Sequence, residues 1–236
     1  MYGWRGRLGV IVPSPNTTVE REFGRSLPEG VSAHFSRMDL GDATAENLQQ
    51  MEDDAEQCAD LLAAADVDIV AYACTTGSFV NGMEHDEKIE SRLSDVAGVP
   101  AITTGASIRR AFDELNVTSV AVATPYLDEL NRQLVEFIES NGISVLDLER
   151  QQFAESTASG SLFPEVVFRS ATSVDTDEAD AIFVSCTNYR TFEIIPALEE
   201  DCGKPVITSN QATLWDALRT IGVDYSDIEL GTLFWG

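Results

Sequence analysis

Two segments of the chain share one pattern, which is a short apolar run, a cysteine and then small polar side chains. Residues 69–73 lead into Cys74, and residues 181–185 lead into Cys186. Short apolar runs that end in small polar residues are typical of buried parallel strands. Loops at the carboxyl ends of such strands bind ligands in open α/β sheets. The two segments therefore predict two sheets, each with a cysteine at its ligand-binding edge.

The rest of the chain repeats around these segments. The predicted strands are residues 8–12, 31–37, 67–73, 100–103, 119–123, 143–148, 181–185 and 205–208. Helical patterns are predicted to begin at residue 16 and to cover residues 42–65, 83–97, 105–115, 127–141, 163–173, 191–200 and 210–221, while residues 151–160 are predicted to form a polar loop. Alternating strands and helices indicate an α/β fold with mainly parallel sheets.

The spacing of the repeat predicts two pseudo-symmetric units. Asn16 precedes Cys74 by 58 positions, and Tyr126 precedes Cys186 by 60 positions. We expect two three-layer α/β units, residues 1–112 and 113–211, with about residues 212–236 packing on the first. The active site is then predicted in the cleft between the units.

The charge balance limits the classes of partner. The 236 residues include 15 basic and 40 acidic side chains, for a formal net charge of −25, and the acids are spread along the chain. This spread predicts a solvated surface adapted to high salt, where self-repulsion is screened. Nucleic acid and anionic membranes are excluded as partners on this ground. No apolar run approaches the ~18 to 20 residues of a membrane span, and no signal peptide is recognised, so we expect a cytoplasmic protein.

The cysteine pattern argues against a metal site. None of the four cysteines forms a CxxC pair, and the chain has two histidines, so the usual zinc spacing is absent. Cys58 is predicted to be a core residue of a helix, and Cys202 lies in a polar turn.

Cys74 and Cys186 are candidates for proton or nucleophile chemistry on the two faces of a small substrate. A helix N-terminus lowers the pKa of a thiol, and hydroxyl and amide side chains follow both cysteines. Such donors suit the binding of a carboxylate or an enolate-like intermediate. The alternative is structural, because cysteine is among the most buried residue types. Because the two cysteines occupy matched positions in the repeat, we favour a functional site over a structural role.

Four segments carry a resemblance to a known family. Residues 6–17, 73–78, 123–126 and 185–188 resemble the aspartate/glutamate racemase superfamily, in its maleate cis–trans isomerase and arylmalonate decarboxylase branch. The decarboxylases lack a cysteine in the first loop, so Cys74 makes the chain more similar to the isomerases.

The resemblance implies site residues. It assigns catalysis to Cys74 and Cys186, and substrate binding to Ser14, Asn16, Thr75, Thr76, Tyr126, Thr157, Thr187 and Asn188. In one respect the chain departs from the isomerases, which carry a further substrate-binding asparagine in the loop that matches residues 153–160. Thr157 or Ser156 is the expected replacement.

The resemblance also implies a reaction. It is a cofactor-independent isomerisation of a small dicarboxylate, with maleate to fumarate as the leading case, by a homodimer. The Cys74 thiolate would add to the double bond, and Cys186 would supply and remove a proton. Two alternatives remain open, an amino-acid or hydantoin racemase with two acid/base cysteines, and a non-catalytic protein that binds small carboxylates.

Overall fold

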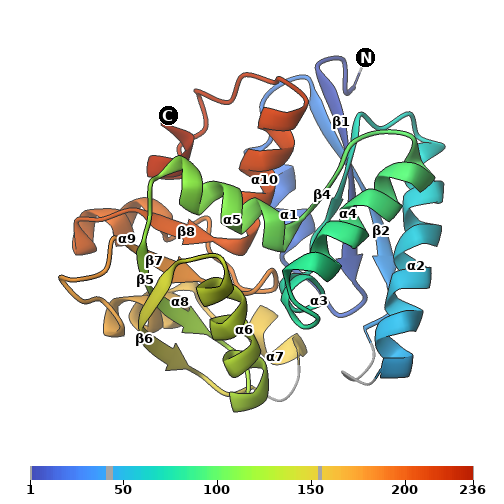
Figure 1. Ribbon diagram of the computed structural model, residues 1–236. Coiled ribbons are helices and arrows are strands. Elements are labelled where there is room, and N and C mark those ends of the chain that lie inside the picture. The colour runs from blue at the N-terminus through green and yellow to red at the C-terminus, as the bar shows by residue number, and fades with distance from the viewer. Residues whose placement is uncertain (1, 41–44, 154–155, 236) are drawn as a thin grey trace.

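The computed structural model describes residues 2–40, 45–153 and 156–235, and it contains two four-stranded parallel sheets (Figure 1). The first sheet has the order β2-β1-β3-β4 and the second the order β6-β5-β7-β8. The strands of the first sheet are β1 (Gly6–Pro13), β2 (Val31–Met38), β3 (Ile69–Tyr72) and β4 (Ala101–Thr103). Those of the second are β5 (Ser119–Thr124), β6 (Ser144–Arg150), β7 (Ala181–Val184) and β8 (Val206–Thr208).

Ten α-helices and one 3-10 turn accompany the strands in the described part of the chain. The helices of the first half are α1 (Val19–Ser26), α2 (Ala45–Ala63), α3 (Thr75–Phe79), α4 (Met83–Ala97) and α5 (Thr104–Glu114). Those of the second are α6 (Asp128–Ser140), α7 (Ser156–Gly160), α8 (Pro164–Ser173), α9 (Ile195–Cys202) and α10 (Ser209–Thr220), followed by the turn η1 (Thr232–Phe234).

The helices cover both faces of each sheet. Figure 1 shows α2 and α4 side by side on one face of the first sheet, and α8 and α9 lie against the second sheet in the matching way. The central strands β1, β3, β5 and β7 are buried almost throughout, because helices cover both of their faces. Continuous apolar runs are what such doubly covered strands require.

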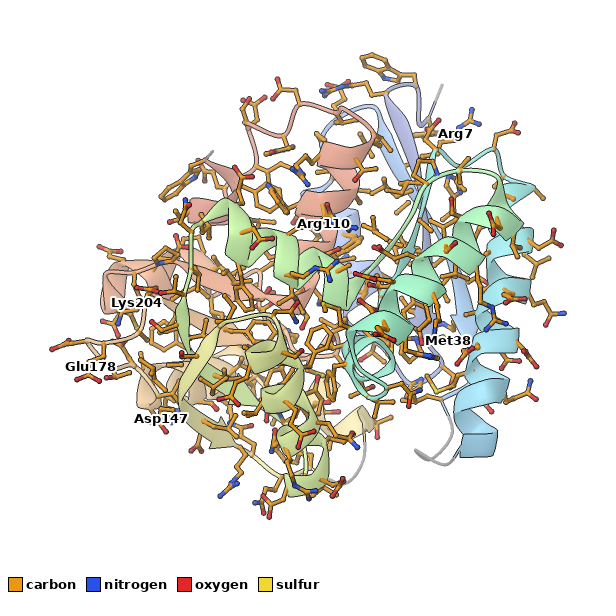
Figure 2. All side chains as sticks on the ribbon, in the orientation of Figure 1. Arg7, Met38, Arg110, Asp147, Glu178 and Lys204 are labelled. Atoms are coloured by element: carbon orange, nitrogen blue, oxygen red, sulfur yellow. The ribbon has the colours of Figure 1, made fainter. Side chains whose placement is uncertain are left out.

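The helices α5 and α10 join the two halves. They pack on one another, and each contacts the fourth strand of both sheets, β4 and β8. Buried polar groups cross this contact, since Thr104 Oγ1 lies 3.0 Å from Thr213 Oγ1 and the Ser107 hydroxyl donates to Asp216 at 3.0 Å. Arg110 on α5 faces α10 (Figure 2) and forms an ion pair with the buried Asp216 at 2.7 Å. The two sheets are therefore joined through the packing of α5 against α10.

The predicted α/β class, the parallel sheets and all eight strands are confirmed. The assignment of the units to residues 1–112, 113–211 and 212–236 stays a prediction, although the strands of the two sheets lie within residues 6–103 and 119–208. Cys58 is buried, as predicted, beside Met51, Ala55 and Leu62. The predicted helix start at residues 42–44 lies outside the described residues.

Four local predictions were wrong. Residues 75–79 and 156–160 form the short helices α3 and α7 where loops were expected, and α9 begins at Ile195 after a turn instead of at residue 191. Cys202 is the last residue of α9, not part of a turn. A five-residue helix completes less than two turns, so it cannot show a 3.6-residue apolar period.

Of the acidic side chains whose burial the structure describes, those of Glu22, Asp86 and Asp216 are buried, and the others are exposed or partly exposed. Asp147 and Glu178 are exposed and point outward from the second half of the molecule (Figure 2). No helix in the described residues is both long and apolar enough to cross a membrane.

Candidate active site

Cys74 lies two residues after the end of β3 and caps the N-terminus of α3. Its side chain is 2% exposed, and its Sγ accepts a hydrogen bond from the Gly77 amide at 3.3 Å. The Thr76 hydroxyl lies 3.6 Å from the same sulfur. The Tyr72 hydroxyl also hydrogen-bonds Cys74. Three polar groups therefore surround one buried thiol.

Cys186 follows β7 at the matching place in the second sheet. Its φ of 146° is unusual for a residue with a side chain, and such conformations persist where the surroundings hold them. Here its amide donates to Ser209 Oγ at 3.0 Å, and its carbonyl accepts from the Tyr189 amide at 3.1 Å. Its Sγ accepts from the Asn188 amide at 3.3 Å. The strained backbone thus orients the thiol.

Ser209 and Tyr126 connect the two cysteine segments. Ser209 Oγ accepts from the Cys186 amide and also from Thr75 Oγ1 at 3.0 Å, so one hydroxyl joins the two loops. Tyr126 is buried, and its hydroxyl hydrogen-bonds Cys186, Thr75 and Ser185. The charge of Cys74 also acts to raise the pKa of Cys186, which is consistent with two thiols near one another. The structure therefore brings both predicted catalytic residues to one site.

Burial raises the pKa of both thiols, contrary to the expectation from helix N-termini. Burial raises the pKa of Cys186 to about 11, although donors from Asn188 and Ser159 oppose the shift. Burial also raises the pKa of Cys74 above its ordinary value, while Thr76 and Gly77 act in the opposite direction. The prediction was wrong because burial removes the hydration that stabilises a thiolate, and the few hydrogen-bond donors at each sulfur stabilise it by less than this loss.

Asn16 has two roles, because it caps a helix and also contacts a residue of the site. Its Oδ1 accepts from the amides of Thr18 and Val19, both at 3.0 Å, which caps α1. Its Nδ2 donates to Thr187 Oγ1 at 3.3 Å, beside Cys186. The predicted residues Asn16 and Thr187 are thus joined in one network.

Asn188 extends this network, because its Oδ1 accepts from the Thr17 amide at 2.9 Å. Through Asn188 the start of α1 therefore contacts the Cys186 segment.

Two predicted residues lie apart from this cluster. Ser14 is exposed, and its hydroxyl hydrogen-bonds Asp39 Oδ1 at 3.2 Å and the Leu40 amide at 3.3 Å. Thr157 has an exposed side chain on α7.

Ser159, on the same helix, is 3% exposed and hydrogen-bonds Cys186. The departure from the isomerase pattern in this segment therefore leaves a serine beside the thiol, two positions after the residue we predicted.

Sequence reasoning missed four polar residues of the site, namely Ser159, Ser185, Ser209 and Tyr72. Ser209 had a usable signal, since it follows a strand and precedes a helix in the repeat. The contacts of Ser159 depend on α7, which no sequence pattern predicted. Among the described residues, no group of three histidine, cysteine or acidic side chains could hold a metal ion.

Comparisons with known proteins agree with this geometry. A family model for arylmalonate decarboxylase matches residues 8–234. The maleate isomerase of Geobacillus stearothermophilus is 28% identical over 244 residues, covering 98% of this chain and 97% of that protein. The arylmalonate decarboxylase of Bordetella bronchiseptica is 26% identical over 222 residues, with 91% and 90% covered.

Two crystal structures are also similar. A maleate isomerase from Pseudomonas putida S16, a cysteine-to-alanine variant with maleate, has a TM-score of 0.91 and 30% identity over 98% of each chain. A cysteine-to-serine variant of the maleate cis–trans isomerase of Nocardia farcinica, with a covalently bound succinylcysteine intermediate, has a TM-score of 0.89 and 26% identity over 97% of this chain and 98% of that one. The chain belongs to the arylmalonate decarboxylase family, in the branch that also contains the maleate isomerases.

Proposed function

We propose that the chain is a cofactor-independent maleate cis–trans isomerase. The observation that carries the proposal is the pair of buried thiols, Cys74 and Cys186, which end equivalent strands of two sheets and meet at Ser209 and Tyr126. The similarity to maleate isomerases over nearly the whole chain supports the same reaction. A thiol on each side of one small substrate suits covalent catalysis combined with proton transfer.

Cys74 is the proposed nucleophile. Its sulfur accepts from the Gly77 amide and contacts the hydroxyls of Thr76 and Tyr72, and these donors favour the thiolate. The thiolate adds to one carbon of the maleate double bond, and a C–S bond forms. A maleate isomerase with a succinylcysteine intermediate is among the structures similar to this chain.

Cys186 is the proposed acid and base. Burial raises its pKa to about 11, which keeps the thiol protonated near neutral pH. As the C–S bond forms, the π electrons move to the second carbon, which takes the proton of Cys186. The central bond is then single and rotates. Cys186 removes the same proton, the double bond re-forms, and Cys74 leaves as the thiolate with release of fumarate.

The remaining polar groups are proposed to bind the two carboxylates. Asn16, Tyr126, Thr187 and Asn188 are buried around the thiols and offer hydroxyl and amide donors. Ser159 beside Cys186 is the residue of α7 placed to assist. Ser14 and Thr157, which the resemblance assigned to substrate binding, are exposed and lie apart from the thiols, so they would have to move to reach the substrate.

The test is turnover of maleate, followed as fumarate formation, by the wild type and by Cys74→Ala and Cys186→Ala. We expect activity in the wild type and a loss of at least ~10²-fold in each variant, because each removes a reacting group. In the wild type, kcat/KM should rise with pH above 7, since the raised pKa of Cys74 leaves little thiolate there. Absence of fumarate with a folded wild type would refute the proposal.

The alternatives from the sequence are not favoured. The similar proteins described above are maleate isomerases and arylmalonate decarboxylases, and none is a racemase. We further propose that the enzyme acts as a homodimer in the cytoplasm, and that its acidic surface is suited to high salt. The net charge of −25 supports the last point.

A further inference from the structure

A pocket outside the thiol site gathers arginines in a chain that has few cations. It has a volume of about 440 Å³, and its lining includes Arg21, Arg25 and Arg190. We call it the arginine pocket. Eleven residues line it, and the 15 basic residues among 236 would place roughly one or fewer there by composition. The volume lies in the range of small-molecule pockets, ~300 to 1,000 Å³.

The arginine side chains retain free donors. Arg25 and Arg190 share one counter-ion, Glu193, at 3.4 and 2.9 Å. Arg21 is exposed, and within the described residues no ion pair involves it. Each guanidinium has five N–H donors arranged to bind a carboxylate with two hydrogen bonds. Arg21 and Arg25 lie four positions apart on α1 and so share a helix face.

The other walls complete the chemistry of the pocket. Glu22 contributes a buried carboxyl, whose pKa burial raises to about 7, so it is partly neutral near neutral pH. Phe192 and Leu230 supply apolar surface. The lining holds three guanidinium groups and two carboxyl groups, those of Glu22 and Glu193, which leaves an excess of positive charge in a protein that is otherwise strongly negative.

We propose that the arginine pocket is a second binding site for a small dianion, such as the dicarboxylates of the proposed reaction. This choice of ligand rests on the proposed function. Neither Cys74 nor Cys186 lines the pocket, so it is distinct from the thiol site.

The pocket shares a wall with the thiol site. Thr18 lines the pocket, and its hydroxyl donates to the carbonyl of Asn188 at 2.9 Å. Glu22 accepts from the amides of Thr191 and Phe192 and, at 2.6 Å, from Asn210.

Asn210 Nδ2 also donates to the carbonyl of Thr187 at 3.0 Å, next to Cys186. A ligand in the arginine pocket therefore contacts groups that hold the Cys186 segment.

The experiment counts bound succinate by equilibrium dialysis of the labelled compound at low chloride, because chloride screens and competes. Succinate has no double bond and cannot be isomerised. The pocket variant is Arg21→Gln/Arg25→Gln. The matched control, Arg132→Gln/Arg169→Gln, removes the same charge from exposed positions on α6 and α8.

We expect two succinates per chain in the wild type and in the control, and one in the pocket variant. Arg21→Gln alone breaks no ion pair of the described residues and should weaken the second site at least threefold. Neutral succinamide should not displace the label. Equal numbers of bound succinates in the pocket variant and the control would overturn the proposal. Maleate turnover by the wild type tests the proposed function separately, so the two failures can be told apart.

Discussion

Replacing Glu22 by glutamine should flatten the pH dependence of stability. The Glu22 carboxyl is buried, and burial raises its pKa from 4.5 to about 7. Because the folded-state pKa lies above the unfolded value, folding takes up a proton between these two pH values. The group therefore contributes stability that is fully present below pH 4.5 and is lost as the pH rises through 7.

The magnitude follows from the size of the pKa shift. One pKa unit corresponds to about 1.4 kcal/mol, so a shift from 4.5 to about 7 corresponds to about 3 kcal/mol. Most of this change, about 2 to 3 kcal/mol, falls between pH 5 and 8.5, a range that stays above the sequence isoelectric point of about 4.1. Relative to Glu22→Gln, the wild type should lose this amount across the range.

The assay is urea unfolding of wild type and Glu22→Gln at five pH values from 5 to 8.5. The amide cannot accept all the donors that the carboxylate does, since Asn210 and the amides of Thr191 and Phe192 converge on it. A constant difference in the free energy of unfolding between the two proteins is therefore expected, and the measured quantity is the slope of that free energy against pH. Comparing variants also cancels the contribution of Asp86, whose pKa burial likewise raises to about 7.

Glu29→Gln, at an exposed position, is the control and should run parallel to the wild type. Parallel curves for Glu22→Gln would refute the reasoning.

Three further predictions concern packing, the loop junction and salt. Gly77→Ala should destabilise the fold by about 1 to 3 kcal/mol in urea unfolding, because a Cβ there would lie 2.2 Å from the Tyr72 hydroxyl. The control is Gly24→Ala on α1, where an added Cβ would meet no neighbouring atom within 4 Å, and it should stabilise the fold by up to ~1 kcal/mol. Equal effects of the two substitutions on the free energy of unfolding would contradict the clash with Tyr72. Ser209→Ala should lower the free energy of unfolding by about 1 to 3 kcal/mol and should also lower kcat, because it leaves the buried Cys186 amide without its acceptor. An unchanged kcat would contradict the role of Ser209 in joining the two cysteine segments. Stability should rise from low to multimolar KCl, and a flat profile would disprove adaptation to salt.

The strands and the two thiols could be predicted because their signals are local. The apolar residues 181–184 are all buried, as expected for a strand covered on both faces, and Cys186 lies two positions after the end of this run. The pairing of the halves was also visible, because the spacing between site residues repeats. The strand and cysteine signals depend on residues near one another in the chain, and the repeat depends only on spacing along it.

The contacts that complete the site were not visible because they join distant segments. Ser209 lies 134 residues after Thr75, and only the packing of α10 between the sheets brings the two hydroxyls together. Ser159 reaches Cys186 from a helix too short to show a period. The direction of the pKa shifts of Cys74 and Cys186 depends on how deeply the packed segments bury the two thiols, and this burial cannot be predicted from the sequence.

The central claim is that Cys74 forms a covalent bond with the substrate while Cys186 handles the proton. The most direct measurement is mass spectrometry of Cys186→Ser after incubation with maleate, with peptide mapping of the modified residue and Cys74→Ala/Cys186→Ser as the control. We predict an added mass of one maleic acid on Cys74 and none in the control. No adduct, or an adduct at Cys58 or Cys202 with Cys74 unmodified, would contradict the account.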